Sequence, residues 1–144
     1  MVAFKRPESV LVVVYTKDAQ VLMLERVEPN GYWQSVTGSL LDGESFSQAA
    51  CRELKEETGL LGKLTETHLE NTFPIAPAWR ERFAPEVTHN HEKVFALRLD
   101  APCEVSLNPH EHVRQCWMPR EQAAARASSW TNRDAILALL PANP

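Results

Sequence analysis

The stretch 38–60 constrains the fold more than any other part of the chain, because its pattern predicts a helix with well-marked ends. Ser45 is followed three residues later by Gln48, which matches a capping box, and Gly59 is a typical C-terminal stop. One apolar stripe along the predicted helix is formed by Phe46, Ala50 and Leu54. We expect this stripe to pack against the protein core.

The same predicted helix carries three glutamates, Glu53, Glu56 and Glu57, whose spacing places their carboxylates on one face. Like charges at this spacing repel by about 0.2–0.5 kcal/mol per pair, and a cation between them relieves the repulsion. Mg²⁺ suits such a site because it prefers carboxylate oxygens, waters and substrate phosphates as ligands. We expect Arg52 to pair at most with Glu56. From these residues alone, a solvated charged helix face is an equal alternative.

The stretch also matches the motif G-x(5)-E-x(7)-R-E-U-x-E-E-x-G-U, where U is a bulky aliphatic residue, without a departure. The matching residues are Gly38, Glu44, Arg52, Glu53, Leu54, Glu56, Glu57, Gly59 and Leu60. The chain therefore resembles a Nudix hydrolase. The resemblance implies an α/β fold, an α/β/α sandwich with a central mixed β-sheet. It also implies an enzyme that uses Mg²⁺, with Mn²⁺ as a substitute, to cleave a nucleoside diphosphate linked to another group.

Four further segments, 5–7, 32–38, 82–85 and 129–133, resemble bacterial Nudix enzymes that hydrolyse dihydroneopterin triphosphate. This resemblance implies dihydroneopterin monophosphate and pyrophosphate as products, in a step of folate biosynthesis. Two alternatives stay open. A Nudix pyrophosphatase acting on purine nucleoside triphosphates, such as dATP or oxidised dGTP, would carry the same motif. A noncatalytic nucleotide-sensing module is the more remote alternative, because sensors often lose motif glutamates and this chain keeps them.

Length and charge narrow the range of partners. With 144 residues, the chain is predicted to form a single domain over residues 1–144. The net charge of −4 argues against nonspecific binding to nucleic acid or to anionic membranes. We expect a monomer whose partner is a small pterin or nucleoside triphosphate. No signal-peptide pattern surrounds the apolar run 10–14, so a cytoplasmic protein is expected. The three cysteines lack a CxxC spacing and are expected to be reduced and buried.

Apolar runs bounded by turn residues predict the remaining elements. The run 10–15 is apolar on both faces, which is typical of a central strand. Further strands are predicted at 21–24, 33–36, 69–73, 93–99 and 113–118. Helices are predicted from Pro119 to Arg126 and from Thr131, as the cap, to Leu140. Trp33 is expected to pack in the core.

Several residues outside the motif are candidates for substrate binding. Lys5, before the first strand, and Arg26, after the second, are assigned to phosphate binding with the help of the resemblance. Thr37 offers a hydroxyl group, and Gly38 allows a ligand to approach the backbone. Ser129 is carried over from the resemblance as a polar contact to the pterin or its side chain.

The segment 73–85 is irregular, because it holds three prolines and three aromatic residues. We predict a binding loop whose rings can wall a pocket for a flat heterocycle. The assigned contacts are Phe73, Pro74, Ile75 and Ala76. The alternative is that the rings only hold the loop against the sheet. Arg80 and Arg82 are expected to be solvated.

Glu111 is the candidate carboxylate outside the motif. Nudix hydrolases commonly add a carboxylate from a distant loop, and the resemblance implies Glu111 as metal ligand or general base. The predicted metal-binding and catalytic set is Glu53, Glu56, Glu57 and Glu111. The neighbours His110 and His112 compete as proton-transfer groups. We further expect Arg52 to orient a motif carboxylate, Glu44 to be a weaker ligand, and His89 and His91 to be surface loop residues.

Overall fold

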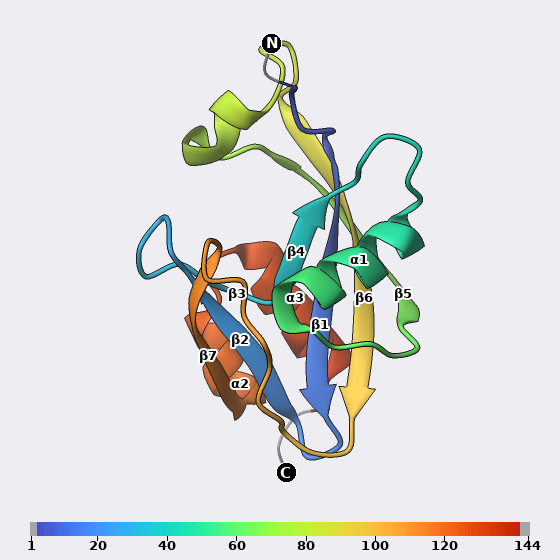
Figure 1. Ribbon diagram of the computed structural model, residues 1–144, viewed down its shortest axis with the longest axis vertical. Coiled ribbons are helices and arrows are strands. Elements are labelled where there is room, and N and C mark those ends of the chain that lie inside the picture. The colour runs from blue at the N-terminus through green and yellow to red at the C-terminus, as the bar shows by residue number, and fades with distance from the viewer. Residues whose placement is uncertain (1–2, 142–144) are drawn as a thin grey trace.

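The computed structural model describes residues 3–141, in which seven strands form one mixed sheet (Figure 1). The strands are β1 (Glu8–Thr16), β2 (Gln20–Arg26), β3 (Trp33–Gln34), β4 (Val36–Ser39), β5 (Thr65–Pro74), β6 (His89–Leu99) and β7 (His112–Pro119). The helices are α1 (Phe46–Thr58), the 3₁₀ helix η1 (Pro77–Arg82), α2 (Arg120–Arg126) and α3 (Trp130–Leu139). In Figure 1, α1 lies in front of the sheet and α2 and α3 lie behind it, which confirms the predicted α/β/α sandwich.

Strand β1 is the centre of the sheet, as its sequence predicts. It runs parallel to β6 along its whole length and antiparallel to β2 and β4. Val10, Val12 and Val14 pack in the core on the α1 side of the sheet. Leu11 and Val13 pack on the other side, beneath α2 and α3. An apolar run with both faces buried therefore marks the strand shared by both layers of core.

The sheet divides at β1 into two arms. Strand β4 pairs with the first half of β1, from Ser9 to Val12. Strand β2 meets β1 at the register pair Tyr15 and Val21, and then continues beside β7. As a result β2 and β7 diverge from β1 toward the left of Figure 1 as they leave the turn at the bottom of the view. The end of β2 and the start of β7 are thereby left free to face the end of α1.

Helix α1 has the ends that its sequence predicts. The Ser45 hydroxyl accepts a hydrogen bond from the Gln48 amide at 3.1 Å, and the Gln48 side chain accepts one from the Ser45 amide at 2.9 Å. Gly59 ends the helix with a φ of 75°, a conformation that favours glycine. Ala50 and Leu54 are buried in the core and Phe46 packs against it, so the apolar stripe is confirmed.

Three local expectations are wrong. Helix α3 is capped by Ser129, whose hydroxyl accepts from the Asn132 amide at 3.2 Å, while Thr131 lies inside the helix. The strand expected at 33–36 is split at Ser35, whose amide donates to the Asn132 side chain at 2.7 Å. Strand β6 begins at His89, so His89 and His91 lie in a strand.

The cysteine expectation is also wrong with respect to burial. Cys51 and Cys103 are exposed, and Cys116 is half-buried. All three are free thiols, and Cys116 packs against the core on the α2 and α3 side of the sheet. Within residues 3–141, none of the helices has the length and apolar character needed to cross a membrane.

Candidate active site

A cluster of three ligand-type side chains forms where α1 ends and β7 begins. Glu57 lies in the last turn of α1, Glu111 in the loop before β7, and His112 at the first position of β7. One ligand atom from each of these side chains lies within 4.8 Å of the others. Glu57 and His112 are buried and Glu111 is half-buried. Glu111 therefore lies next to a motif glutamate, although the two residues are far apart in the sequence.

Glu57 is the unusual member of this cluster. Its exposed fraction is 0%, and neither carboxylate oxygen accepts a hydrogen bond of ordinary geometry from the described residues. Burial, followed by the nearby carboxylates of Glu53 and Glu111, raises the pKa of Glu57 well above its usual value. A buried carboxylate without a partner is strongly unfavourable. A divalent cation, which takes carboxylate oxygens as ligands, fits this arrangement.

His112 is held as a neutral imidazole. Burial and the positive charge of Arg26 lower the pKa of His112 to about 4. Its Nε2 atom lies 3.1 Å from the Gln34 side-chain nitrogen and 3.8 Å from the Glu57 carboxylate. A neutral imidazole with this pKa can accept a hydrogen bond or bind a metal, but it is a poor base at neutral pH.

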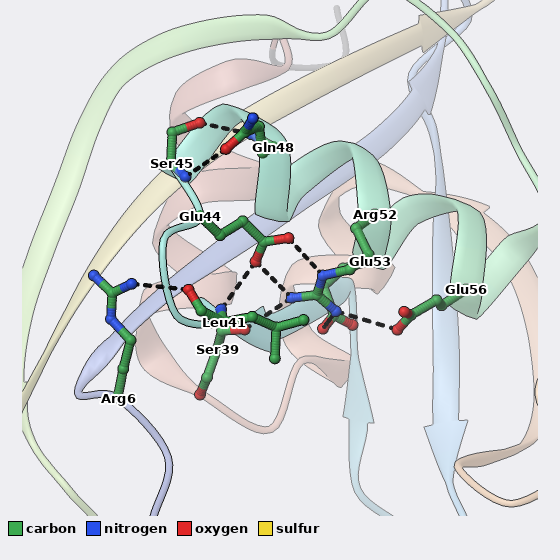
Figure 2. Close-up of polar contacts among 9 residues, drawn as sticks. All are labelled: Arg6, Ser39, Leu41, Glu44, Ser45, Gln48, Arg52, Glu53 and Glu56. Carbon is green, nitrogen blue, oxygen red and sulfur yellow. Dashed lines mark hydrogen bonds and ion pairs between the residues drawn. The ribbon is translucent and has the colours of Figure 1, made fainter.

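Arg52 organises three further carboxylates, those of Glu44, Glu53 and Glu56 (Figure 2). It donates to both oxygens of Glu44 at 2.7 and 2.9 Å and to Glu53 at 2.7 Å. Its bond to Glu56 is longer, at 3.3 Å, and it also donates to the Ser39 carbonyl at 3.0 Å. The expectation that Arg52 pairs at most with Glu56 is therefore wrong. The guanidinium group of Arg52 therefore links the loop before α1 to the helix through several hydrogen bonds.

Gly38 is required by the position of Glu53. A Cβ atom at residue 38 would lie 2.2 Å from the carboxylate carbon of Glu53, far inside van der Waals contact. Gly38 lies in β4 opposite Val10 of β1, so the backbone has little freedom to move away. The close approach predicted at Gly38 is thus made by the protein's own carboxylate, which Arg52 holds in place.

A pocket of about 390 Å³ lies beside the carboxylates, in the size range of small-molecule sites. Seven of the eight predicted substrate-binding residues line it, namely Lys5, Thr37, Phe73, Pro74, Ile75, Ala76 and Ser129. Trp79 and Phe83 add aromatic walls, as the irregular sequence 73–85 predicts. Arg26 does not line this pocket. A second cavity, of about 340 Å³, shares Lys5 and Ser39 with the pocket and is also lined by Glu53.

Three cations lie at the pocket or near the carboxylate cluster. Lys5 and Arg82 line the pocket, and Arg26 is near enough to Glu57 and Glu111 for their charges to act on its pKa. The guanidinium groups of Arg26 and Arg82 lie 4.9 and 4.7 Å from the centre of the Trp79 ring. Desolvation and then Arg82 lower the pKa values of Lys5 and Arg26, while Glu111 acts in the opposite direction on both. We call Lys5, Arg26 and Arg82 the cation group. Arg82 is exposed, as the sequence analysis expects, and it also lines the pocket. The same expectation is wrong for Arg80, which is half-buried and donates to the carbonyls of Val87 and Pro85.

The NUDIX domain model matches residues 5–140. The chain belongs to the Nudix family. It is 44% identical over 139 residues to dihydroneopterin triphosphate diphosphatase of Escherichia coli K12, covering 92% of this chain and 91% of that protein. The corresponding protein of Haemophilus influenzae is 37% identical over 94% of this chain and 89% of its own length. A solved structure of the E. coli dihydroneopterin triphosphate pyrophosphohydrolase matches with a TM-score of 0.90 at 40% identity, covering 96% and 97% of the two chains.

The Nudix motif glutamates differ in their surroundings. Glu53 and Glu57 are buried, and the contact between their carboxyl groups contributes to the raised pKa of Glu57. The side chain of Glu56 is 53% exposed and turns toward Arg52. His110 is exposed, whereas its neighbour His112 belongs to the cluster. Of the two histidines that compete with Glu111 as proton-transfer groups in the sequence, only His112 therefore lies among the carboxylates.

Melting curves test whether Glu57 is poised for a cation. We predict that millimolar Mg²⁺ raises the Tm of the wild-type protein, because a cation bound by the native state stabilises it by mass action. Glu57→Gln should lose this increase. In metal-free buffer the variant should melt no lower than wild type, since it removes an unpaired buried acid whose raised pKa destabilises the folded state at neutral pH.

The matched control is Glu104→Gln, which removes the same charge from an exposed position. It should keep the full effect of Mg²⁺. An equal rise of Tm in wild type and Glu57→Gln would show that the ion binds elsewhere.

Proposed function

We propose that this Nudix protein is a Mg²⁺-dependent dihydroneopterin triphosphate diphosphatase. The observation that carries the proposal is that three chemically different regions follow one another along the site. An aromatic pocket, the cation group and the carboxylate cluster adjoin one another. They match the three parts of such a substrate, namely a flat ring, a triphosphate and a scissile phosphoanhydride. The high identity to bacterial enzymes of that name, over most of the chain, supports the same assignment.

The proposed metal ligands are Glu53, Glu57 and Glu111, with Glu56 in an outer position because its side chain is exposed and paired with Arg52. When bound, Mg²⁺ supplies positive charge that neutralises phosphate oxygens and acidifies a bound water. Arg52 and Glu44 keep Glu53 oriented toward the site. The unpaired oxygens of Glu57 support its place in this set.

Glu111 is the proposed general base. It is half-buried, and burial and Glu53 raise its pKa, so it can take up a proton more readily than an ordinary surface carboxylate. His112 is less suitable, because its lowered pKa leaves it a weak base and Gln34 lies at hydrogen-bond distance from Nε2. Water deprotonated by Glu111 would attack the substrate so that pyrophosphate leaves and dihydroneopterin monophosphate remains.

The cation group is proposed to hold the triphosphate. Arg26 and Arg82 share the Trp79 ring, which fixes their separation and keeps both guanidinium planes in place. Lys5 lies at the junction of the two cavities and can reach phosphate from either side. Phosphate oxygens would relieve the mutual repulsion of these cations, just as Mg²⁺ would relieve that of the carboxylates.

A substrate panel tests the proposal. With excess Mg²⁺, the protein should hydrolyse dihydroneopterin triphosphate with a kcat/KM at least about tenfold above those for dATP and oxidised dGTP, and it should release pyrophosphate. Glu57→Gln and Glu53→Gln should keep the fold and lower kcat by about two or more powers of ten, because each deletes a charge needed for turnover. Glu104→Gln should retain wild-type kcat.

A higher kcat/KM for a purine nucleotide than for dihydroneopterin triphosphate would contradict the pterin assignment. Retention of more than about a tenth of wild-type kcat in both glutamine variants would contradict the role of the carboxylates.

Ring binding and phosphate binding should be separable. Phe73 lines the pocket and makes an edge contact with Trp130 at 6.4 Å between ring centres, so Phe73→Ala should raise KM for dihydroneopterin triphosphate more than it lowers kcat. The lost stacking is about 0.5–1.5 kcal/mol beyond the buried area. Arg26→Ala should instead lower kcat/KM for pterin and purine triphosphates by a similar factor.

The measurement is the pterin-to-purine ratio of kcat/KM in both variants. If Arg26→Ala changes this ratio and Phe73→Ala leaves it at the wild-type value, ring binding has been assigned to the wrong region of the site.

A further inference from the structure

A buried carboxyl group, Glu92, lies in the pocket far from the Nudix motif in sequence. It lines the pocket from β6 and has an exposed fraction of 5%. Its register partners are Ser9 on β1 and Asn71 on β5, so it lies in the middle of the sheet. Val94, two positions later, packs beneath α2 and α3, so Glu92 projects from that same face of the sheet.

Glu92 is not satisfied by its protein neighbours. Side chains of Thr131 and Asn71 hydrogen-bond to the carboxyl group, but its Oε1 atom has no partner. No ion pair joins it to a cation within residues 3–141, and burial raises its pKa to about 7. Packing alone does not explain a charged residue here, since an apolar side chain of similar volume would avoid the unpaired atom.

Asn90 adds a second unpaired acceptor on the same face of β6. It is also 5% exposed and lines the pocket. Its Nδ2 atom donates to the Ser9 hydroxyl at 2.8 Å, which identifies Oδ1 as the free end of the amide. Oδ1 has no partner among the described residues. Two positions on one strand therefore present unpaired oxygen acceptors, and both line a cavity large enough for a small molecule.

A ligand that presents N–H donors along one edge would satisfy this pair of acceptors. Dihydroneopterin contains a 2-amino-4-oxo pyrimidine ring, and guanine contains the same ring with its oxo group numbered 6. In both, a ring N–H lies directly beside an exocyclic amino group. A carboxylate can accept a hydrogen bond from each of them. The corresponding edge of adenine has a ring nitrogen acceptor beside its amino group, so a carboxylate there would face a lone pair.

We propose that Glu92, with Asn90 beside it, binds the N–H and amino edge of a 2-amino-4-oxo heterocycle and thereby rejects adenine. The inference rests on the proposed function only in taking the pocket as the ring site, and it adds the residues that read the ring. It also gives the unpaired oxygens a role. Sites built to hydrogen-bond a particular group discriminate strongly against analogues that lack it, because the site's own polar groups are then left unpaired.

Glu92→Gln tests this inference with almost no change in shape. The amide presents one donor and one acceptor, which suits adenine and opposes one N–H of the pterin edge. We expect kcat/KM for dihydroneopterin triphosphate and for dGTP to fall at least about tenfold, mainly through KM, while that for dATP stays constant or rises. The adenine-to-pterin and adenine-to-guanine ratios should therefore both increase.

The matched control is Glu66→Gln, an exposed glutamate on the neighbouring strand β5. It should leave both ratios at their wild-type values. Melting curves show whether Glu92→Gln is folded. Asn90→Ala provides a second, independent variant, which should change the ratios in the same direction by a smaller factor.

The outcomes separate this inference from the proposed function. If wild type hydrolyses dihydroneopterin triphosphate best but folded Glu92→Gln keeps the adenine-to-pterin ratio, the inference fails and the proposed function stands. If wild type instead prefers dGTP and Glu92→Gln reverses the preference toward dATP, the proposed function fails and the edge-reading role of Glu92 stands. Unchanged ratios in both Glu92→Gln and Asn90→Ala overturn the inference whichever substrate is best.

Discussion

The buried carboxylate of Glu57 is the constraint on which the candidate active site depends. It has no accessible surface and no hydrogen bond of ordinary geometry from the described residues, and two further carboxylates lie near enough to raise its pKa. The fold can hold this arrangement because α1 is anchored elsewhere. Ala49, Ala50 and Leu54 are buried against the sheet, so packing of the helix offsets the unfavourable charge at its end.

The carboxylates proposed for catalysis and the pocket proposed for ring binding come from different elements of the fold. The carboxylates come from α1 and from the start of β7, whereas the pocket is walled by the segment 73–83, β6 and the first turn of α3. Gln34 connects the two parts, since it lines the pocket and lies within hydrogen-bond distance of His112. Family members can therefore share the motif helix and still differ in substrate, because the ring-binding residues lie outside it.

Local patterns were sufficient to predict the elements that carry the chemistry. The ends of α1 follow from Ser45, Gln48 and Gly59, which act within one turn of the helix, and the central position of β1 follows from its apolar run. The Arg52 contacts were underestimated because Glu44 lies in the loop before the helix, where helical spacing says nothing about geometry. Likewise, Ser35 meets Asn132 only because α3 packs against the sheet.

The polar residues of the ring pocket were not predictable for a related reason. Asn90 and Glu92 alternate with their neighbours as in any half-buried strand, so their sequence does not distinguish a pocket lining from a solvated face. Their environment depends on β1, β5 and α3 converging above them, and those contacts are long-range. The contact of the exposed Arg82 with Trp79 was missed in the same way, because Arg26, which shares that ring, comes from a distant strand.

Direct measurement of cation binding tests the central claim that Glu57 is held ready for a metal ion. Mn²⁺ can be titrated into the protein at neutral pH, with the free ion followed by electron paramagnetic resonance. Glu57→Gln should raise the Kd for Mn²⁺ by at least about tenfold, a change that even the loss of an outer partner of a metal site can produce. Glu104→Gln should bind Mn²⁺ as wild type does. An equal Kd for wild type and Glu57→Gln would show that Glu57 does not bind the ion.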